Sequence, residues 1–355
     1  MNIQELLEVT IKNKASDLHL LVGLPPAIRI DGTLNYLNSY GQISPQDIET
    51  MISSILKPEQ KELLDANKEI DFSLGFGGGA YGDLGRFRIN AYYQRGYLSA
   101  AFRFLEPKIK TIEELKLPKI CHTFANLRQG FVLVTGPTGH GKSTTIAAII
   151  NEINIKRAAH ILTIEDPIEY VYPIEKSIVS QREIDIDTHS WANALRSALR
   201  EDPDVVLVGE MRDPETVSAA ITIAETGHLV FSTLHTNSAS QTIDRIIDVF
   251  PANQQAQIKT QLASSLKGII SQRLLPQISG GRVPAVEVLV GNSAVASNIR
   301  EGKTHLIDSV IQTSQESGMI TLESSLASLV LSGTISLDIA KGYSLRPNEL
   351  MRLLG

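Results

Sequence analysis

Residues 136–144 combine glycines, a lysine and hydroxyl side chains at the spacing G-x-x-x-x-G-K-[ST], which binds nucleotide phosphates. In chain order they are Gly136, Pro137, Thr138, Gly139, His140, Gly141, Lys142, Ser143 and Thr144. Glycine lets the backbone approach phosphate oxygens closely, and the N–H groups of a following helix point at the anion. Lys142 is placed to reach the β- and γ-phosphates, and the Ser143 hydroxyl to bind Mg²⁺. We therefore predict an ATP and Mg²⁺ site here.

Two carboxylates follow apolar runs and could act on the same phosphates. Glu210 follows the run 205–208 by two residues, where it could orient or deprotonate the attacking water. Glu165 and Asp166 follow the run 161–164 and suit water activation, although an aspartate before proline is also a turn signal. Glu165 and Glu210 could each contact Mg²⁺ through water. We predict catalytic roles for Glu210 and Glu165.

A third apolar run, 229–234, lies between His228 and His235. His235 could sense the γ-phosphate from the end of this run, either by donating a hydrogen bond or as a cation. A lone histidine is more often structural, but two on one candidate catalytic strand favour a functional role for His235.

The apolar runs that must position these residues alternate with helical patterns. The runs are 131–135, 161–164, 205–208 and 229–234. Such alternation predicts an α/β domain in which helices cover both faces of a parallel sheet. After residue 252 the pattern favours helices.

The first 105 residues predict a smaller α+β domain. We expect a helix over 2–14, strands over 18–22 and 27–34, a helix starting at Ser44-Pro45, a glycine-rich loop over 75–85, and a hairpin of 86–94 with 97–105. Arg88 and Arg103 are each seven residues from the turn at Arg95-Gly96, so they should be cross-strand neighbours on one face. A linker over 106–118 would join this domain to an ATPase domain over 119–355.

Composition excludes several classes of protein. The chain has 355 residues and a formal net charge of −6, without a basic tail, which argues against a nucleic-acid partner. Its one cysteine, Cys121, excludes an internal disulfide framework and a four-cysteine zinc site. We see neither a signal peptide nor an apolar run of about 18 residues, so we expect a cytoplasmic protein without a transmembrane segment.

With these motifs in place, the chain resembles the secretion-ATPase superfamily, and closely the type IV pilus retraction ATPases that drive twitching motility. The resemblance runs over nearly the whole length. It is carried by residues 16–20, 85–88, 136–144, 163–169, 198–204, 208–213, 226–239 and 294–301. In the last of these runs only Ala294, Ile299, Arg300 and Glu301 agree with the retraction family. His140 also departs from it, because the family usually has a small residue there.

The resemblance implies a homo-hexameric ring that hydrolyses ATP to pull pilin subunits back into the inner membrane. It implies a PAS-like N-terminal domain joined to a RecA-like P-loop motor domain. It also implies an inner-membrane platform protein as partner, and a location at the inner face of the cytoplasmic membrane. The family uses arginines at the positions of Arg88 and Arg103 to close the N-terminal domain over ATP. Their guanidinium groups offer a fixed fork of donors to phosphate oxygens.

Related proteins leave alternatives open. A pilus-extension or type II secretion ATPase would usually carry a further N-terminal domain and a tetracysteine zinc site, and we expect neither here. A nucleic-acid translocase is a less favoured alternative, because of the net negative charge.

Overall fold

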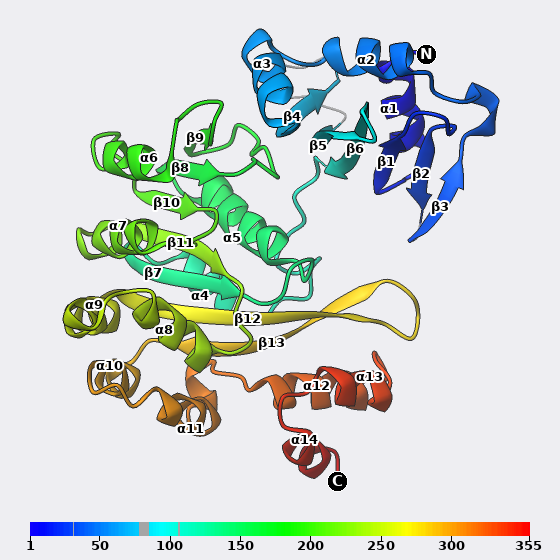
Figure 1. The fold of residues 1–355 in the computed structure, drawn as a ribbon. Helices are drawn as coiled ribbons and strands as arrows, with labels where there is room; N and C mark the ends of the chain where they lie inside the picture. Colours follow the sequence, from blue (N-terminus) through cyan, green and yellow to red (C-terminus); the bar gives the residue numbers. More distant parts are fainter. Residues whose placement is uncertain (31, 78–84, 106) are drawn as a thin grey trace. The chain divides into compact units, whose positions relative to one another are not determined.

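The structure is a computed structural model that describes residues 1–30, 32–77, 85–105 and 107–355 (Figure 1). It divides into two compact units. The first comprises Met1–Lys108 and Pro167–Val171, and the second Ile109–Asp166 and Tyr172–Gly355. Of the predicted linker, Glu106 lies outside the described residues, whereas residues 109–118 belong to the second unit. Ile112 and Leu117 are buried in the core of that unit.

The first unit is an antiparallel sheet covered by helices. Its helices are α1 (Ile3–Lys12), the 3₁₀ turn η1 (Asn38–Tyr40), α2 (Pro45–Ser53) and α3 (Pro58–Asn67). Its strands are β1 (Asp17–Leu20), β2 (Ala27–Ile30), β3 (Thr33–Tyr36), β4 (Glu69–Phe76), β5 (Gly85–Gln94) and β6 (Tyr97–Leu105), in the spatial order β3-β2-β1-β6-β5-β4. Alternate residues of β1, β5 and β6 bury their side chains with apolar side chains of α1 and α2.

Local signals in this unit mark its turns and caps. Ser44 caps α2 in a reciprocal capping box with Asp47. The predicted hairpin is confirmed, with its turn at Arg95 and Gly96, both at positive φ. The single strand predicted over 27–34 is wrong: it is the hairpin of β2 and β3, which turns through Gly32 at φ 84°. Residues 78–84 of the glycine-rich stretch lie outside the described residues.

The second unit is built on a larger, mostly parallel sheet. Its strands are β7 (Gly130–Thr135), β8 (His160–Glu165), β9 (Ile178–Glu183), β10 (Val205–Val208), β11 (Leu229–Leu234), β12 (Leu266–Pro276) and β13 (Arg282–Val290), in the order β13-β12-β7-β11-β10-β8-β9. All neighbours are parallel except β12 with β13. The prediction of a parallel sheet from the four apolar runs is confirmed.

Helices cover both faces of this sheet. They are α4 (Ile120–Ala125), α5 (Lys142–Lys156), α6 (Trp191–Ala198), α7 (Pro214–Glu225), α8 (Ala239–Asp248), α9 (Ala252–Ser265), α10 (Ser293–Arg300), η2 (Thr304–Leu306), α11 (Ile307–Thr313), η3 (Gln315–Ser317), α12 (Leu322–Leu331), α13 (Leu337–Tyr343) and α14 (Pro347–Leu354). On β7, Phe131 and Leu133 pack with α6–α9, whereas Val132 and Val134 pack with α4 and α5 (Figure 1). Burial on both faces explains why the central strands read as continuous apolar runs.

The prediction that the chain becomes mostly helical after residue 252 is only half right. The hairpin of β12 and β13 extends the sheet beside β7 before α10–α14 follow (Figure 1). Helices α12–α14 pack on this hairpin through a separate apolar cluster. Within the described ranges, no helix is both long and apolar enough to cross a membrane.

Candidate functional site

The carboxyl ends of four neighbouring strands form one edge of the parallel sheet. The strand registers pair Thr135 with Leu234, Ser232 with Val208, and Val208 with Ile164. The loops that leave β7, β11, β10 and β8 therefore lie side by side, as expected for ligand sites of parallel sheets. These are the four loops that carry the predicted site residues of the second unit.

The phosphate loop, residues 136–141, joins β7 to the N-terminus of α5. Gly136 has φ 140°, and a Cβ atom there would lie 2.3 Å from the backbone oxygen of Gln272. Gly141, at φ 81°, is the residue that caps α5. Only glycine fits the close approach at residue 136, and glycine adopts the positive φ of both positions without strain. The geometry and donor set of the loop fit a nucleotide phosphate.

Lys142 lies under this loop, with only 8% of its surface exposed. Its Nζ donates to the carbonyl oxygens of Gly136 at 3.0 Å and Pro137 at 3.1 Å, and it lies 3.4 Å from Nδ1 of His235. The Thr138 hydroxyl lies 3.3 Å from Nδ1 of His235 as well. The ammonium group is thus held beside the loop that would carry the phosphates. Ser143 and Thr144 follow in the first turn of α5.

His235 connects the phosphate loop to Glu210. Its Nδ1 faces the Lys142 ammonium group, which can only donate, so this nitrogen is placed to accept a hydrogen bond. Nε2 lies 3.3 Å from Oε1 of Glu210. His235 therefore links the lysine of the phosphate loop to the candidate base.

Glu210 lies two residues beyond the end of β10. Its Oε2 accepts a hydrogen bond from Nη2 of Arg212 at 2.9 Å. Burial opposes ionisation of the carboxyl, but Arg212 and His235 outweigh this, and together they lower its pKa below the ordinary value. Glu210 is therefore a carboxylate at neutral pH, as proton acceptance from water requires.

Glu165 is the last residue of β8, on the same edge. Its Oε1 accepts from the hydroxyl of Thr163 at 2.7 Å and from the amide of Gln181 at 3.4 Å. Gly209 lies against it, because a Cβ atom on that glycine would be 3.3 Å from Cα of Glu165. The structure thus brings Glu165 and Glu210 to neighbouring strand ends.

His140 turns its ring toward β12. Its Nδ1 accepts from the backbone N–H of Leu274 at 3.0 Å, and its ring centroid lies 6.2 Å from that of Tyr343. Burial first, then the charges of Arg273 and Lys142, lower the pKa of His140. A neutral ring bound to β12 does not supply charge to the phosphates.

Two supporting residues were missed from the sequence. Arg212 follows Glu210 by two residues, and its charge beside a candidate base was a usable signal. Gln272 lies on β12, and its side-chain amide donates to the carbonyl oxygen of His140 at 2.8 Å. The apolar run around Gln272 could have revealed a strand there.

His228 does not belong to the site. It precedes β11, at the opposite end of that strand from His235, and its Nδ1 lies 3.0 Å from the carbonyl oxygen of Ile223 at the end of α7. The argument that two histidines on one strand share a function is therefore wrong for His228.

Arg88 and Arg103 lie in the first unit, where β5 and β6 pair them directly across the hairpin, as predicted. Arg88 donates to Asp71 at 3.2 Å, and Arg103 donates to Asp17 at 3.3 Å. Both guanidinium groups remain substantially exposed. Each has a carboxylate partner within its own unit.

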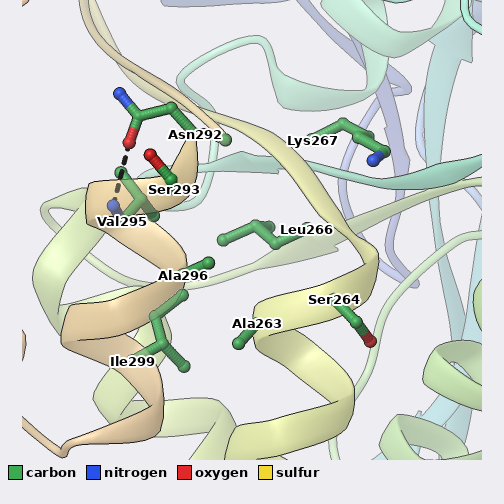
Figure 2. A pocket seen from close by; sticks show the side chains of 10 residues that line it. Ala263, Ser264, Leu266, Lys267, Asn292, Ser293, Val295, Ala296 and Ile299 are labelled. Carbon is green, nitrogen blue, oxygen red and sulfur yellow. Dashed lines mark hydrogen bonds between the residues drawn. The ribbon is translucent and has the colours of Figure 1, made fainter.

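A pocket of about 220 Å³ lies between α9 and α10 (Figure 2). It is lined by Leu266 and Lys267 at the start of β12 and by Val295, Ala296 and Ile299 of α10, among others. Leu266 pairs with Phe131, so the pocket is at the amino ends of the strands. It is separate from the nucleotide loops.

Comparison with known proteins gives consistent matches. Residues 105–334 match the family model described as "Type II/IV secretion system protein". The chain is 47% identical over 341 residues to the type IV pilus retraction ATPase PilT of Pseudomonas aeruginosa, covering 96% of this chain and 97% of that one. It is 49% identical over 317 residues to a twitching motility protein of Neisseria gonorrhoeae, covering 89% and 83%. A crystal structure of the pilus retraction motor PilT with bound ADP aligns with a TM-score of 0.92 at 48% identity, covering 99% of each chain.

Proposed function

The chain belongs to the type II/IV secretion system protein family and is a P-loop ATPase, and we propose that it is the motor that powers type IV pilus retraction in twitching motility. The observation that carries this proposal is the full-length similarity to retraction motors, 47% identity over 96% of the chain. The phosphate loop with Lys142, and Glu210 beside His235, supply the residues that such a motor needs.

At this site, the loop 136–141 and Lys142 would hold the phosphates of ATP. Ser143 would bind Mg²⁺ directly, with Glu165 and Glu210 reaching it through water. Glu210 would accept the proton of the attacking water, and His235, between Lys142 and Glu210, would sense the γ-phosphate by a hydrogen bond or as a cation. The ionised state of Glu210 supports this assignment.

We further propose that the active species is a homo-hexameric ring of RecA-like motor domains, each preceded by a PAS-like N-terminal domain. Arg88 and Arg103 would bind the γ-phosphate when that domain closes. Such an exchange would replace their pairs with Asp71 and Asp17. The Arg88–Asp71 pair is exposed on both sides, and pairs of this kind contribute only about 0–1 kcal/mol. Because Ile112 and Leu117 are buried in the second unit, a hinge for closure would precede them. Light scattering at the concentrations that support ATP hydrolysis tests the ring.

The surface of α10 is our candidate for contact with an inner-membrane platform protein, with the motor at the cytoplasmic side of that membrane. Val295 and Ile299 are buried and anchor the helix, whereas Arg300 and Glu301 are exposed. We expect that Arg300→Ala combined with Glu301→Ala keeps ATP hydrolysis in vitro and abolishes twitching. Normal twitching by this double variant would refute the assignment.

Deletion of the gene in its source organism tests the proposed function. Cells that carry excess surface pili and do not twitch identify a retraction motor. Bald cells identify an extension ATPase, and normally piliated cells with a secretion defect identify a type II secretion ATPase. DNA-stimulated ATP hydrolysis by the purified protein would instead indicate a translocase.

A further inference from the structure

Two adjacent residues of β12, Gln272 and Arg273, point to opposite faces of the sheet and bind two different loops of the site. β12 runs parallel to β7, and Ser271 pairs with Thr135, the last residue before the phosphate loop. Gln272 and Arg273 are therefore level with that loop. Both are almost fully buried, with 2% and 6% of their surfaces exposed.

The Gln272 side chain binds the phosphate loop and the helix that follows it. Its Nε2 donates to the carbonyl oxygen of His140 at 2.8 Å, and its Oε1 accepts from the hydroxyl of Thr145 at 2.8 Å. Its backbone oxygen lies where a Cβ atom of residue 136 would fall. One residue thus touches the beginning and the end of the loop and the first turn of α5. These contacts hold the phosphate loop and the start of α5 against β12.

The Arg273 side chain binds the loop after β11. Its Nη2 donates to both the backbone oxygen and Oδ1 of Asn237, each at 3.0 Å. Asn237 is two residues beyond His235, which contacts Glu210 and Lys142. Glu287, on the neighbouring strand β13, accepts from the N–H of Ala239 at 2.7 Å and holds the same segment. Arg273 therefore fixes where the loop of His235 lies.

We propose that Gln272 and Arg273 are positioning residues with separable tasks: Gln272 shapes the phosphate loop for nucleotide binding, and Arg273 holds the His235 loop in place for hydrolysis. The phosphate loop contacts ATP and ADP alike, whereas the partners of His235 matter where the γ-phosphate is cleaved. A change at Gln272 must then act on affinity, and a change at Arg273 on turnover.

The test is to measure KM and kcat for ATP, equilibrium affinity for a fluorescent ADP, and melting temperature for the full chain. Gln272→Glu places a second acceptor against the His140 carbonyl, while it keeps the acceptor for Thr145. We expect KM for ATP and Kd for ADP to rise about tenfold or more, which is about 1.4 kcal/mol, with kcat nearly unchanged. Arg273→Lys keeps the charge but loses the two-point contact. It should lower kcat about tenfold and leave ADP affinity within about twofold.

Two further variants keep the test decisive if a buried substitution impairs folding. Asn237→Ala changes an exposed residue, removes one acceptor of Arg273 and should reproduce the kcat effect in weaker form. Gln277→Met, in the turn that joins β12 to β13, removes a hydrogen bond to the Arg282 carbonyl and serves as the matched control with wild-type kinetics.

The proposal is overturned if Gln272→Glu binds ADP and ATP as the wild type does. It is equally overturned if Gln272→Glu, Arg273→Lys and Asn237→Ala all lose affinity and turnover to the extent that their melting temperatures fall. Both residues would then have only a structural role. The inference rests on ATP hydrolysis at this site. A wild-type protein without ATPase activity would count against the proposed function. The variants test only the roles of Gln272 and Arg273.

Discussion

Replacing Glu210 by glutamine should separate proton acceptance from positioning. The glutamine has the same shape, but its amide is no base and turns an NH₂ group toward either Arg212 or His235. The Arg212 side chain is 73% exposed, so the pair that is lost is largely solvated and contributes about 0–1 kcal/mol to folding. Loss of a general base lowers turnover about 10²- to 10⁴-fold. We therefore expect a folded protein that binds Mg·ATP and hydrolyses it very slowly.

The assay is phosphate release at saturating Mg·ATP, with equilibrium ATP affinity and melting temperature measured on the same preparation. Arg212→Ala is the matched control, because it removes the ion pair and leaves the carboxylate. Without Arg212 the pKa of Glu210 should rise toward its ordinary value, so the acid limb of the pH–rate profile should move to higher pH while neutral turnover largely persists. Near-wild-type turnover by Glu210→Gln would remove this residue from the chemistry. Equal losses of affinity, stability and turnover would make its role structural.

Three further predictions concern other groups. Lys142→Ala should weaken ATP and ADP binding about 10- to 100-fold, and unchanged affinity would contradict the phosphate-loop assignment. Arg88→Lys with Arg103→Lys keeps both charges but not the guanidinium forks, so turnover should fall at least about tenfold, and an unchanged ATPase rate would exclude these arginines from the γ-phosphate. Burial raises the pKa of Glu287 to about 7 despite the hydrogen bond from Ala239. Because the folded protein holds this proton more tightly than the unfolded chain, the stability that it contributes is complete below about pH 4.5 and is lost as pH rises through 7. Glu287→Gln should therefore gain about 3 kcal/mol relative to the wild type between pH 5 and 8, and a pH-independent difference in melting temperature would refute this.

The site elements that the sequence predicts correctly are those with short-range signals. The strands before Glu165, Glu210 and His235 are continuous apolar runs because both of their faces are buried. Since parallel strands present their carboxyl ends at one edge, identifying four such strands was enough to predict that the loops meet. The cross-strand pairing of Arg88 with Arg103 was also predicted correctly, because it depends only on counting residues from the turn of the hairpin.

The strand at the edge of the sheet and the strands that follow α9 were missed, because polar residues interrupt their apolar patterns. β9 borders only one neighbour, and its residues are mostly half-exposed, so Ser180 and Arg182 interrupt any apolar run. β12 follows α9 directly, and the polar pair Gln272-Arg273 interrupts its apolar pattern. For β2 and β3, the prediction passed over the dipeptide Asp31-Gly32, which is typical of hairpin turns, because the stretch around it alternates like one strand.

The interruption in β12 carried more information than the prediction used. A buried amide and a buried guanidinium are costly unless their hydrogen bonds are made. Within the strand, Nη1 of Arg273 donates to the carbonyl oxygen of Gln272 at 3.3 Å, but the backbone of β12 is otherwise paired with β7 and β13. The other partners come from elsewhere in the chain. Gln272 binds His140, 132 residues away, and Thr145, 127 residues away, and Arg273 binds Asn237, 36 residues away. No local pattern can identify such partners, but the physical demand for them is local. In a chain with a phosphate loop, a polar pair inside an otherwise apolar strand points to loops that must be held in place, and here those loops carry Lys142 and His235.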